Sequence, residues 1–271
     1  MANSRALLVG INTFKNFPQN SLKGCVNDVA DMGAYLQGHC GFSKSDIDQL
    51  TNAKATADAI AIGIKALLKG LGNGDRAIFH FSGHGTQVMQ GGKAHDTIVP
   101  YDFDYNKPTT FLTDESFTAL FAGINPKAHV VWVADSCHSG NLARVLPAQG
   151  APASNVRFLP VPAALQAQIT HAISSSLVGP QIRAIIDKLN LSLLAACKSG
   201  EEATDTVFKG RDNGAFTHFL IANLSAKASL SQVITKVIRA LKAAKIADQH
   251  PEVRGMDAAK SHPIFDGLGV H

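Results

Sequence analysis

The chain is poor in cysteine, and its cysteines are irregularly placed. It has 271 residues and four cysteines: Cys25, Cys40, Cys137 and Cys197. Disulfide frameworks belong to small secreted domains with many closely spaced cysteines. We therefore expect free thiols and a reducing, cytoplasmic setting.

Long apolar runs and blocks of like charge are also missing. The first twelve residues hold about six apolar residues in a row, fewer than a signal-peptide core needs. No run approaches the roughly 18 apolar residues of a membrane span. The 25 Lys and Arg residues are scattered, and the formal net charge of +4 is mild. We expect no signal peptide, no membrane span and no nucleic-acid partner.

What the sequence does contain is an alternation of strand and helix patterns. With 45% hydrophobic and 17% charged residues, the composition is that of a globular protein. Strands are expected at 5–11, 76–81, 129–134 and 191–196, and helices at 26–37, 58–71, 114–122, 214–225 and 229–245. This order predicts an α/β fold whose mostly parallel β-sheet is flanked by helices on both faces.

One region departs from this alternation. Residues 141–165 carry four prolines among small and polar residues, which is typical of an exposed linker. Helical spacing returns over 163–188. Because neither flank has enough strands to close a sheet alone, we expect one domain over 1–271 with a mobile internal segment.

Two of the expected strands end in residues that carry chemistry. SGHG (82–85) follows strand 76–81, and DSCHSG (135–140) follows strand 129–134. If these strands are parallel neighbours, both loops leave the same edge of the sheet, where catalytic groups gather in α/β folds.

Cys137 would then be a candidate nucleophile and His84 its candidate base. A thiol attacks as the thiolate and needs a nearby basic group to become one. The glycines beside His84 would let backbone N–H groups approach a developing oxyanion. Taken singly, a cysteine after a strand is more often a small buried apolar residue, and a histidine in a glycine-rich turn is usually structural.

The two segments together resemble a known family. FHFSGHGTQ (79–87) and VWVADSCHSG (131–140) are similar to the catalytic histidine and cysteine segments of caspase-like cysteine peptidases. The similarity is closest to metacaspases and their bacterial relatives, the orthocaspases. Further similar segments run along the chain: ALLVGIN (6–12), LKGCVNDVADM (22–32), IVPYDF (98–103), LTDESF (112–117), LLAACKSGEEATD (193–205) and GAFTHFLIANL (214–224).

The resemblance implies a caspase-like fold with three parts. Residues 1–140 match the large subunit of caspases, and residues 191–271 match the small subunit. Residues 141–190 would be a linker and helical insertion between them. Because this segment offers Arg144, Arg157, Arg183 and Lys188, we expect self-cleavage after at least one of them.

The resemblance also implies roles for individual residues. His84 matches the general base and Cys137 the nucleophile, and the backbone N–H groups of Gly85 and Cys137 match the donors of an oxyanion hole. The expected activity is that of a cysteine endopeptidase.

A second group of residues matches the pocket for P1, the residue before the cleaved bond. Asp28 and Asp135 match its acidic residues, Ser82 matches a serine there, and Cys25 would lie on its wall. Carboxylates in a narrow pocket favour Arg or Lys at P1. The expected partners are therefore peptides and proteins with these residues.

Two other functions stay open. A caspase that cleaves after Asp shares the fold, although it would need a basic pocket, and no basic residues stand at these positions. A catalytically idle caspase-like scaffold is the other alternative. The intact His84 and Cys137 argue against an idle domain. The sequence leaves open a monomer or a homodimer.

Calcium is the remaining question. Calcium-dependent members of the family use carboxylates near segments matched here by Asp96, Asp114 and Glu115. Such members also have an acidic residue shortly after the nucleophile, where this chain has Asn141-Leu142-Ala143-Arg144. Calcium takes roughly 6–8 oxygen ligands, and an arginine near that shell would oppose it. The acidic pair 114–115 also suits the first turn of a helix. We expect no required cofactor, with these three residues as weak metal candidates.

Overall fold

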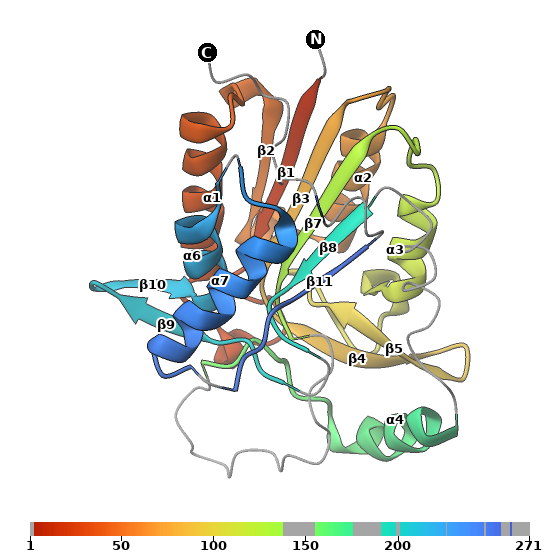
Figure 1. The fold of residues 1–271 in the computed structure, drawn as a ribbon. Coiled ribbons are helices and arrows are strands. Elements are labelled where there is room, and N and C mark those ends of the chain that lie inside the picture. The colour runs from red at the N-terminus through yellow and green to blue at the C-terminus, as the bar shows by residue number, and fades with distance from the viewer. Residues whose placement is uncertain are drawn as a thin grey trace.

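The computed structural model describes residues 3–137, 155–175, 191–198, 201–225, 227–246, 248–255 and 261. Its centre is a six-stranded sheet in the order β11-β8-β7-β3-β1-β2 (Figure 1). The strands are β1 (Ser4–Gly10), β2 (Ile47–Thr51), β3 (Arg76–Ser82), β7 (His129–Asp135), β8 (Leu191–Ala195) and β11 (Glu252–Arg254). All neighbouring pairs are parallel except β11 with β8. The prediction of a mostly parallel sheet is confirmed.

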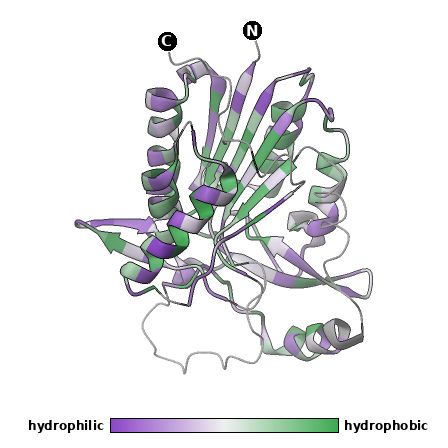
Figure 2. Cartoon of the chain, in the orientation of Figure 1, coloured by the Kyte–Doolittle hydropathy of each residue, from purple (hydrophilic) through white to green (hydrophobic). Residues whose placement is uncertain are grey.

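Helices cover both faces of this sheet, also as predicted (Figure 1). One face carries α2 (Ala57–Leu68) and α3 (Asp114–Phe121). The other carries α1 (Cys25–His39), α6 (Ala215–Asn223) and α7 (Leu230–Ala243). Figure 2 shows apolar residues concentrated in the strands, with helices that are apolar on one side.

Two apolar cores follow from the alternation of side chains along each strand. In β1, Leu7 and Val9 belong to the core under α2 and α3, whereas Ala6 and Leu8 belong to the core under α1, α6 and α7. The strands are buried on both faces, which explains why RALLVGI and HVVWVA are continuous apolar runs rather than alternating ones.

Two smaller sheets lie beside the main one. β4 (Gly85–Gln90), β5 (Lys93–Ile98) and β6 (Leu112–Thr113) form an antiparallel sheet. β9 (Asp205–Phe208) and β10 (Arg211–Gly214) form a hairpin. Gly91 and Gly92 connect β4 to β5 with φ of 55° and 75°, the left-handed conformation that a two-residue hairpin turn favours. The pattern of long apolar runs did not predict these short polar strands.

The expected exposed linker is wrong for residues 157, 159 and 161 but holds for residues 155 and 162–164, which are exposed. Within the segment, Arg157 is 0% exposed, and Leu159 and Val161 are also buried. The chain then enters α4 (Ala163–Ser175), which lies against β4 and β5. The proline-rich composition predicted an exposed segment, but the side chains of Arg157, Leu159 and Val161 pack into the interior of the fold. Residues 138–154 lie outside the described residues. Within the described part of the chain, no helix combines the length and the apolar character needed to cross a membrane.

Candidate active site

The carboxyl ends of β3 and β7 bring the predicted catalytic segments together. The two strands are parallel neighbours, with Ser82 opposite Asp135. His84 and Cys137 each follow two residues later. A Cβ atom on Gly85 would overlap the carbonyl oxygen of Cys137, so the two loops pass each other at a distance that only glycine permits.

His84 is held in one tautomer. Its Nε2 atom lies 2.7 Å from the carbonyl oxygen of Asn20, the last residue of the 3-10 helix Pro18–Asn20. Because a carbonyl oxygen only accepts, Nε2 carries the proton, and in the neutral ring Nδ1 is the unprotonated atom. Nδ1 is buried without a hydrogen-bond partner among the described residues. Burial lowers the pKa of His84 to about 4, although the bond to Asn20 acts in the opposite direction. His84 is therefore a neutral base at pH 7.

Cys137 is buried, and its sulfur faces the loop after β8. The backbone N–H of Ala203 donates to Sγ at 2.9 Å, and Sγ lies 3.6 Å from the Ala203 carbonyl oxygen. The neighbouring thiol of Cys197 lies in the same core. Its pKa is raised, first by a hydrogen bond with Cys137 and then by burial. A backbone donor on Sγ suits a sulfur that becomes a thiolate.

The remaining predicted residues converge on one guanidinium, that of Arg157. Its Nη2 atom donates to Asp28 at 2.7 Å, and Nη1 forms an ion pair with Asp135 at 3.0 Å. Nη1 also donates to the Ser82 hydroxyl at 2.8 Å, and that hydroxyl donates to Asp28 at 2.7 Å. Cys25 is fully buried beside them at the start of α1. We call Asp28, Ser82, Asp135 and Asp205 the acidic pocket.

Asp205 is the member of the acidic pocket that the sequence did not reveal. Its Oδ1 atom accepts from Nε of Arg157 at 2.9 Å and from Nη2 at 2.7 Å. The backbone N–H groups of Lys23 and Gly24 donate to its other oxygen. Burial alone would raise the pKa of Asp205, but Arg157 and the two N–H donors outweigh burial and lower it.

The other two carboxylates are also held firmly. Thr217 donates to Asp135 through its backbone N–H at 2.8 Å and its hydroxyl at 2.7 Å. The backbone N–H of Gly214 donates to both oxygens of Asp28. Burial raises the pKa of Asp28, and the charge of Arg157 opposes that rise. The three carboxylates in turn raise the pKa of Arg157.

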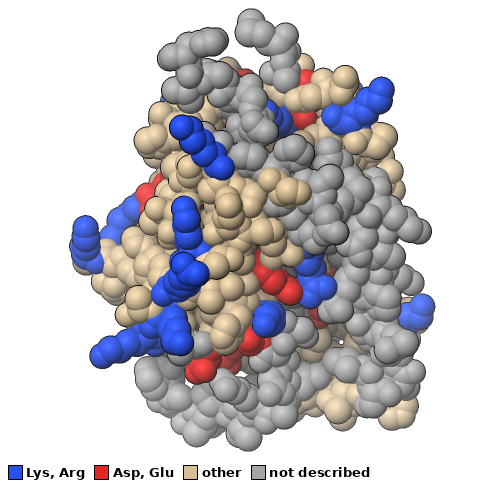
Figure 3. Space-filling model, in the orientation of Figure 1, with Lys and Arg blue, Asp and Glu red and all other residues tan. Residues whose placement is uncertain are grey.

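This arrangement can select a guanidinium. Arg157 donates hydrogen bonds from Nε, Nη1 and Nη2 to acceptors that are themselves held in place. A planar guanidinium can reach several of these acceptors at once, whereas the ammonium group of a lysine can reach fewer of them. Figure 3 shows lysine and arginine side chains spread over the face that carries α7, whereas the pocket carboxylates are buried. The negative charge of the site therefore comes from buried carboxylates and not from acidic residues on the surface.

The main chain of Arg157 occupies the other half of the site. Its carbonyl oxygen accepts from the backbone N–H of Gly85 at 3.0 Å and from that of Cys137 at 3.3 Å. These are the two donors that the resemblance implies for an oxyanion hole. Arg157 therefore joins the two halves of the site, with its side chain in the acidic pocket and its carbonyl oxygen on these two donors.

The weak metal candidates do not form a comparable cluster. Asp114 accepts from His95 at 2.8 Å, and Glu115 lies 4.0 Å from the same ring. Asp96 accepts instead from Gln87 at 3.0 Å. Within the described residues, no group of three or more His, Cys, Asp or Glu side chains could hold a metal ion. These residues do not fit a calcium site, and Arg144 lies outside the described residues.

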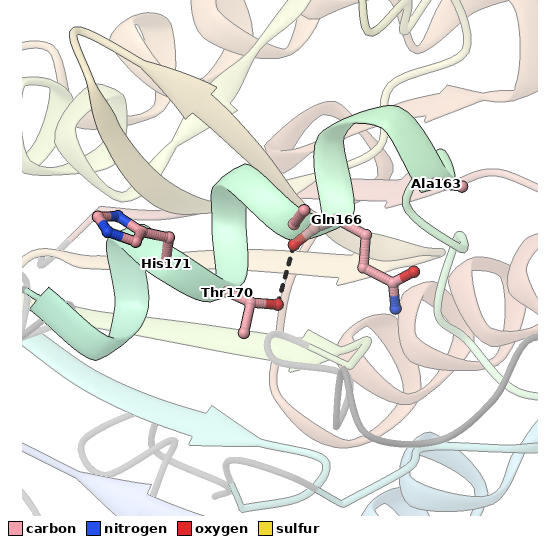
Figure 4. Close-up of a pocket in the computed structure, with 5 residues that line it drawn as sticks. Ala163, Gln166, Thr170 and His171 are labelled. Carbon is pink, nitrogen blue, oxygen red and sulfur yellow. Dashed lines mark hydrogen bonds between the residues drawn. The ribbon is translucent and has the colours of Figure 1, made fainter.

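A surface hollow beside α4 has little chemistry of its own. Figure 4 shows its lining, which comes from a single helix: Ala163, Gln166, Ala167, Thr170 and His171. Thr170 donates to the Gln166 carbonyl oxygen within that helix. The lining includes no residue of the acidic pocket and neither His84 nor Cys137.

Comparison with known proteins identifies the family. Residues 4–146, just over half of the chain, match the model of the metacaspase, peptidase C14 domain. The chain belongs to this metacaspase family. It is 35% identical over 149 residues to Metacaspase-9 of Arabidopsis thaliana, a match that covers 51% of this chain and 43% of that protein.

Other relatives of this metacaspase extend the match. Metacaspase-1 of Candida glabrata is 25% identical over 96% of this chain and 73% of its own length. The solved structure of protein GSU0716 from Geobacter sulfurreducens has a TM-score of 0.71 and 23% identity, with 98% and 100% of the two chains covered, and so shares the fold. The matches to Arabidopsis Metacaspase-9 and to Metacaspase-1A of Aspergillus niger span less than half of those proteins.

Proposed function

We propose that the chain is a cysteine endopeptidase that cleaves peptide and protein substrates after Arg or Lys, with Cys137 as nucleophile and His84 as general base. One observation carries the proposal. The arginine at position 157 lies in the acidic pocket while its carbonyl oxygen accepts from Gly85 and Cys137. The chain's own arginine therefore models the bound substrate.

The chemistry follows from these contacts. His84 accepts the thiol proton of Cys137 at Nδ1, because Nε2 is committed to Asn20. The sulfur attacks the P1 carbonyl carbon, and the backbone N–H groups of Gly85 and Cys137 stabilise the negative charge on its oxygen. His84 then protonates the leaving nitrogen. Water hydrolyses the thioester and restores the free thiol.

The acidic pocket sets the substrate. A P1 Arg loses its hydration on entering, and fixed carboxylates replace that water. A P1 Asp would meet Asp28, Asp135 and Asp205, and like charges at this depth repel strongly. The pocket therefore disfavours the alternative of an Asp-specific peptidase.

The alternative of an idle scaffold has one observation in its favour, which is that Arg157 already fills the pocket.

A turnover assay decides between a working peptidase and an idle scaffold. Matched fluorogenic peptides that differ only at P1, with Arg, Lys or Asp, should be cleaved in the order Arg, Lys and then Asp. Cys137→Ala and His84→Ala should abolish turnover, whereas Cys25→Ala should retain most of it. Turnover that survives in Cys137→Ala, or its absence in the parent chain after prolonged incubation, would overturn the proposal.

Further features of the proposed enzyme rest on the sequence and on the described strands. We propose that it needs no cofactor, that calcium is dispensable and that it works in the cytoplasm. The described sheet ends at β2 on one side and β11 on the other. A monomer, or a homodimer that pairs such an edge, would fit this arrangement.

A further inference from the structure

The two carboxylate oxygens of Asp135 have different partners. Oδ1 forms the ion pair with Nη1 of Arg157 at 3.0 Å, and no hydrogen-bond partner for it lies among the described residues. Oδ2 instead accepts from the backbone N–H of Thr217 at 2.8 Å and from its hydroxyl at 2.7 Å. The contacts of Thr217 with Oδ2 therefore leave Oδ1 as the oxygen that meets a guanidinium.

Asp135 differs in its support from Asp28, the carboxylate on the other side of the guanidinium. Asp28 accepts from the hydroxyl of Ser82 at the end of β3 and from the backbone N–H of Gly214 at the end of β10. Within the described part of the chain, the hydrogen bonds that the Asp135 carboxylate accepts come from Thr217 alone. The orientation of Asp135 therefore depends on one residue, whereas that of Asp28 does not.

The start of α6 places Thr217 against Asp135. The helix follows Gly214, which provides no side-chain cap, and Thr217 is the third residue of the helix. The N–H at this position is one that a capping side chain normally binds. Asp135 binds it from β7, where the positive end of the helix dipole also favours an ionised carboxylate. One set of contacts therefore caps α6 and holds the carboxylate.

A buried histidine lies on the other side of the Thr217 hydroxyl. His80 stands two residues before Ser82 on β3, so both side chains leave the same face of the sheet, and His80 is 0% exposed. Its Nε2 atom lies 3.3 Å from Oγ1 of Thr217. Its Nδ1 atom is buried with no hydrogen-bond partner among the described residues. A proton on Nδ1 would lack an acceptor, so the neutral ring carries its proton on Nε2.

The directions of the hydrogen bonds follow from this tautomer. Because the ring of His80 donates to the Thr217 oxygen, the single hydroxyl proton of Thr217 goes to Oδ2 of Asp135. Burial, with a smaller contribution from the charge of Arg157, lowers the pKa of His80 to about 3. The ring is therefore neutral at pH 7 and adds no positive charge that would compete with a guanidinium.

We propose that Thr217, held by His80, is a positioning residue for substrate specificity, which turns one oxygen of Asp135 toward the guanidinium of a P1 arginine. The inference rests on the proposed function and deepens it, because it adds a residue behind the acidic pocket to those that select the substrate. Thr217 acts on the substrate through Asp135. Its removal should therefore matter only while Asp135 is present.

The first test replaces the hydroxyl of Thr217. Thr217→Val keeps the shape of the side chain and the backbone N–H, and its kcat/KM for an Arg peptide should fall about tenfold, because the lost bond is to a charged group. Thr217→Ser restores a hydroxyl and should recover most of the loss. Thr235→Val, at an exposed position of α7, is the matched control and should cleave the peptide as the parent does.

A double-mutant cycle separates positioning from a merely structural role. In the Asp135→Ala background, Thr217→Val should change the residual kcat/KM by less than about twofold, because the partner of the hydroxyl is already gone. An equal loss in both backgrounds would overturn the inference.

A variant of His80 keeps the inference testable if urea unfolding shows that Thr217→Val does not fold. His80→Leu leaves the Thr217 hydroxyl in place and should lower kcat/KM about threefold in the parent background, and have no effect in Asp135→Ala. A loss that persists in Asp135→Ala would again overturn the inference.

The same assays separate the inference from the proposed function. If the parent cleaves the Arg peptide and Thr217→Val cleaves it equally well, the inference fails and the proposed function stands. If the parent cleaves no Arg peptide, the proposed function fails and the inference fails with it.

Discussion

The chain has two groups of three acidic residues, and they are arranged differently in the structure; sequence analysis connected every member except Asp205 with a cation. Asp28, Asp135 and Asp205 converge from α1, β7 and β9 on one buried guanidinium. Asp96, Asp114 and Glu115 lie closer together in the sequence, yet they bind His95 and Gln87 separately. A cation site therefore depends on the convergence and burial of its carboxylates rather than on how many of them stand near each other in the sequence.

The largest effect should come from removing one carboxylate of the acidic pocket. Asp135→Ala should lower kcat/KM for Arg peptides at least tenfold, because truncating one partner of a buried charged pair commonly costs about 2–5 kcal/mol. The matched variant Asp114→Ala removes a carboxylate from the other group. Steady-state kinetics with Arg and Asp peptides checks the prediction. Equal turnover of both peptides by parent and Asp135→Ala would show that the pocket does not select P1.

A second effect should come from His80, the fully buried histidine whose ring hydrogen-bonds to Thr217, which in turn binds Asp135. Burial, with a smaller contribution from the charge of Arg157, lowers the pKa of His80 to about 3. The ordinary value is about 6.5, so between roughly pH 6 and pH 4 the unfolded chain binds one more proton at this position than the folded chain does. This contribution to stability is complete above the unfolded pKa and is lost as the pH falls.

His80→Asn should therefore flatten the pH dependence of the free energy of unfolding by about 1.4 kcal/mol per pH unit in that range. Urea unfolding in the Cys137→Ala background measures this slope without self-cleavage. The variant His39→Asn, at an exposed position of α1, is the control. An unchanged slope in His80→Asn would mean that His80 is protonated in the folded chain.

A smaller effect should come from narrowing the acidic pocket. A Cβ atom on Gly214 would overlap Oδ2 of Asp135 and would lie 2.5 Å from Nη2 and 2.6 Å from Cζ of Arg157. Gly214→Ala should therefore lower turnover of Arg peptides more than that of Lys peptides, because an ammonium does not reach as widely as a guanidinium. The ratio of the two kcat/KM values should fall several-fold. Gly38→Ala, where a Cβ atom meets nothing within 4 Å, is the control. An unchanged ratio would place the P1 side chain elsewhere.

The smallest effect should come from calcium. Activity should persist in excess chelator, and millimolar calcium should raise it less than a few-fold, because the second acidic group offers too few convergent oxygen ligands. Asp114→Asn should change activity little in either condition. Activity that disappears with chelator and returns only with calcium would show that this group does form a working metal site.

The predictable parts of the fold and site are those with local patterns. The apolar runs of β3 and β7 predicted two buried strands. Sequence analysis made a shared edge for His84 and Cys137 conditional on these strands being parallel neighbours, and in the structure they are. The resemblance added Asp28, Ser82 and Asp135, and the structure brings all three to Arg157.

Asp205 and Arg157 had no such pattern. Asp205 begins a short polar hairpin whose strands, DTVF and RDNG, show no run that distinguishes them from a loop. Arg157 lies in a proline-rich segment, and composition of that kind predicts exposure. It is buried by tertiary contacts with residues far apart in the chain, and local composition does not record such contacts. The segment LLAACKSGEEATD ends at Asp205 and was the one available signal.

Covalent labelling would show whether Cys137 reacts with a substrate whose P1 arginine enters the acidic pocket. A peptide with P1 Arg and an electrophilic ketone in place of the cleaved bond is incubated with the purified chain, and the modified residue is identified by mass spectrometry. The account predicts labelling of Cys137, strong reduction of labelling in Asp135→Ala, and none by the matched P1 Asp probe. Labelling at Cys25 or Cys197 instead, or equal labelling by the Arg and Asp probes, would contradict it.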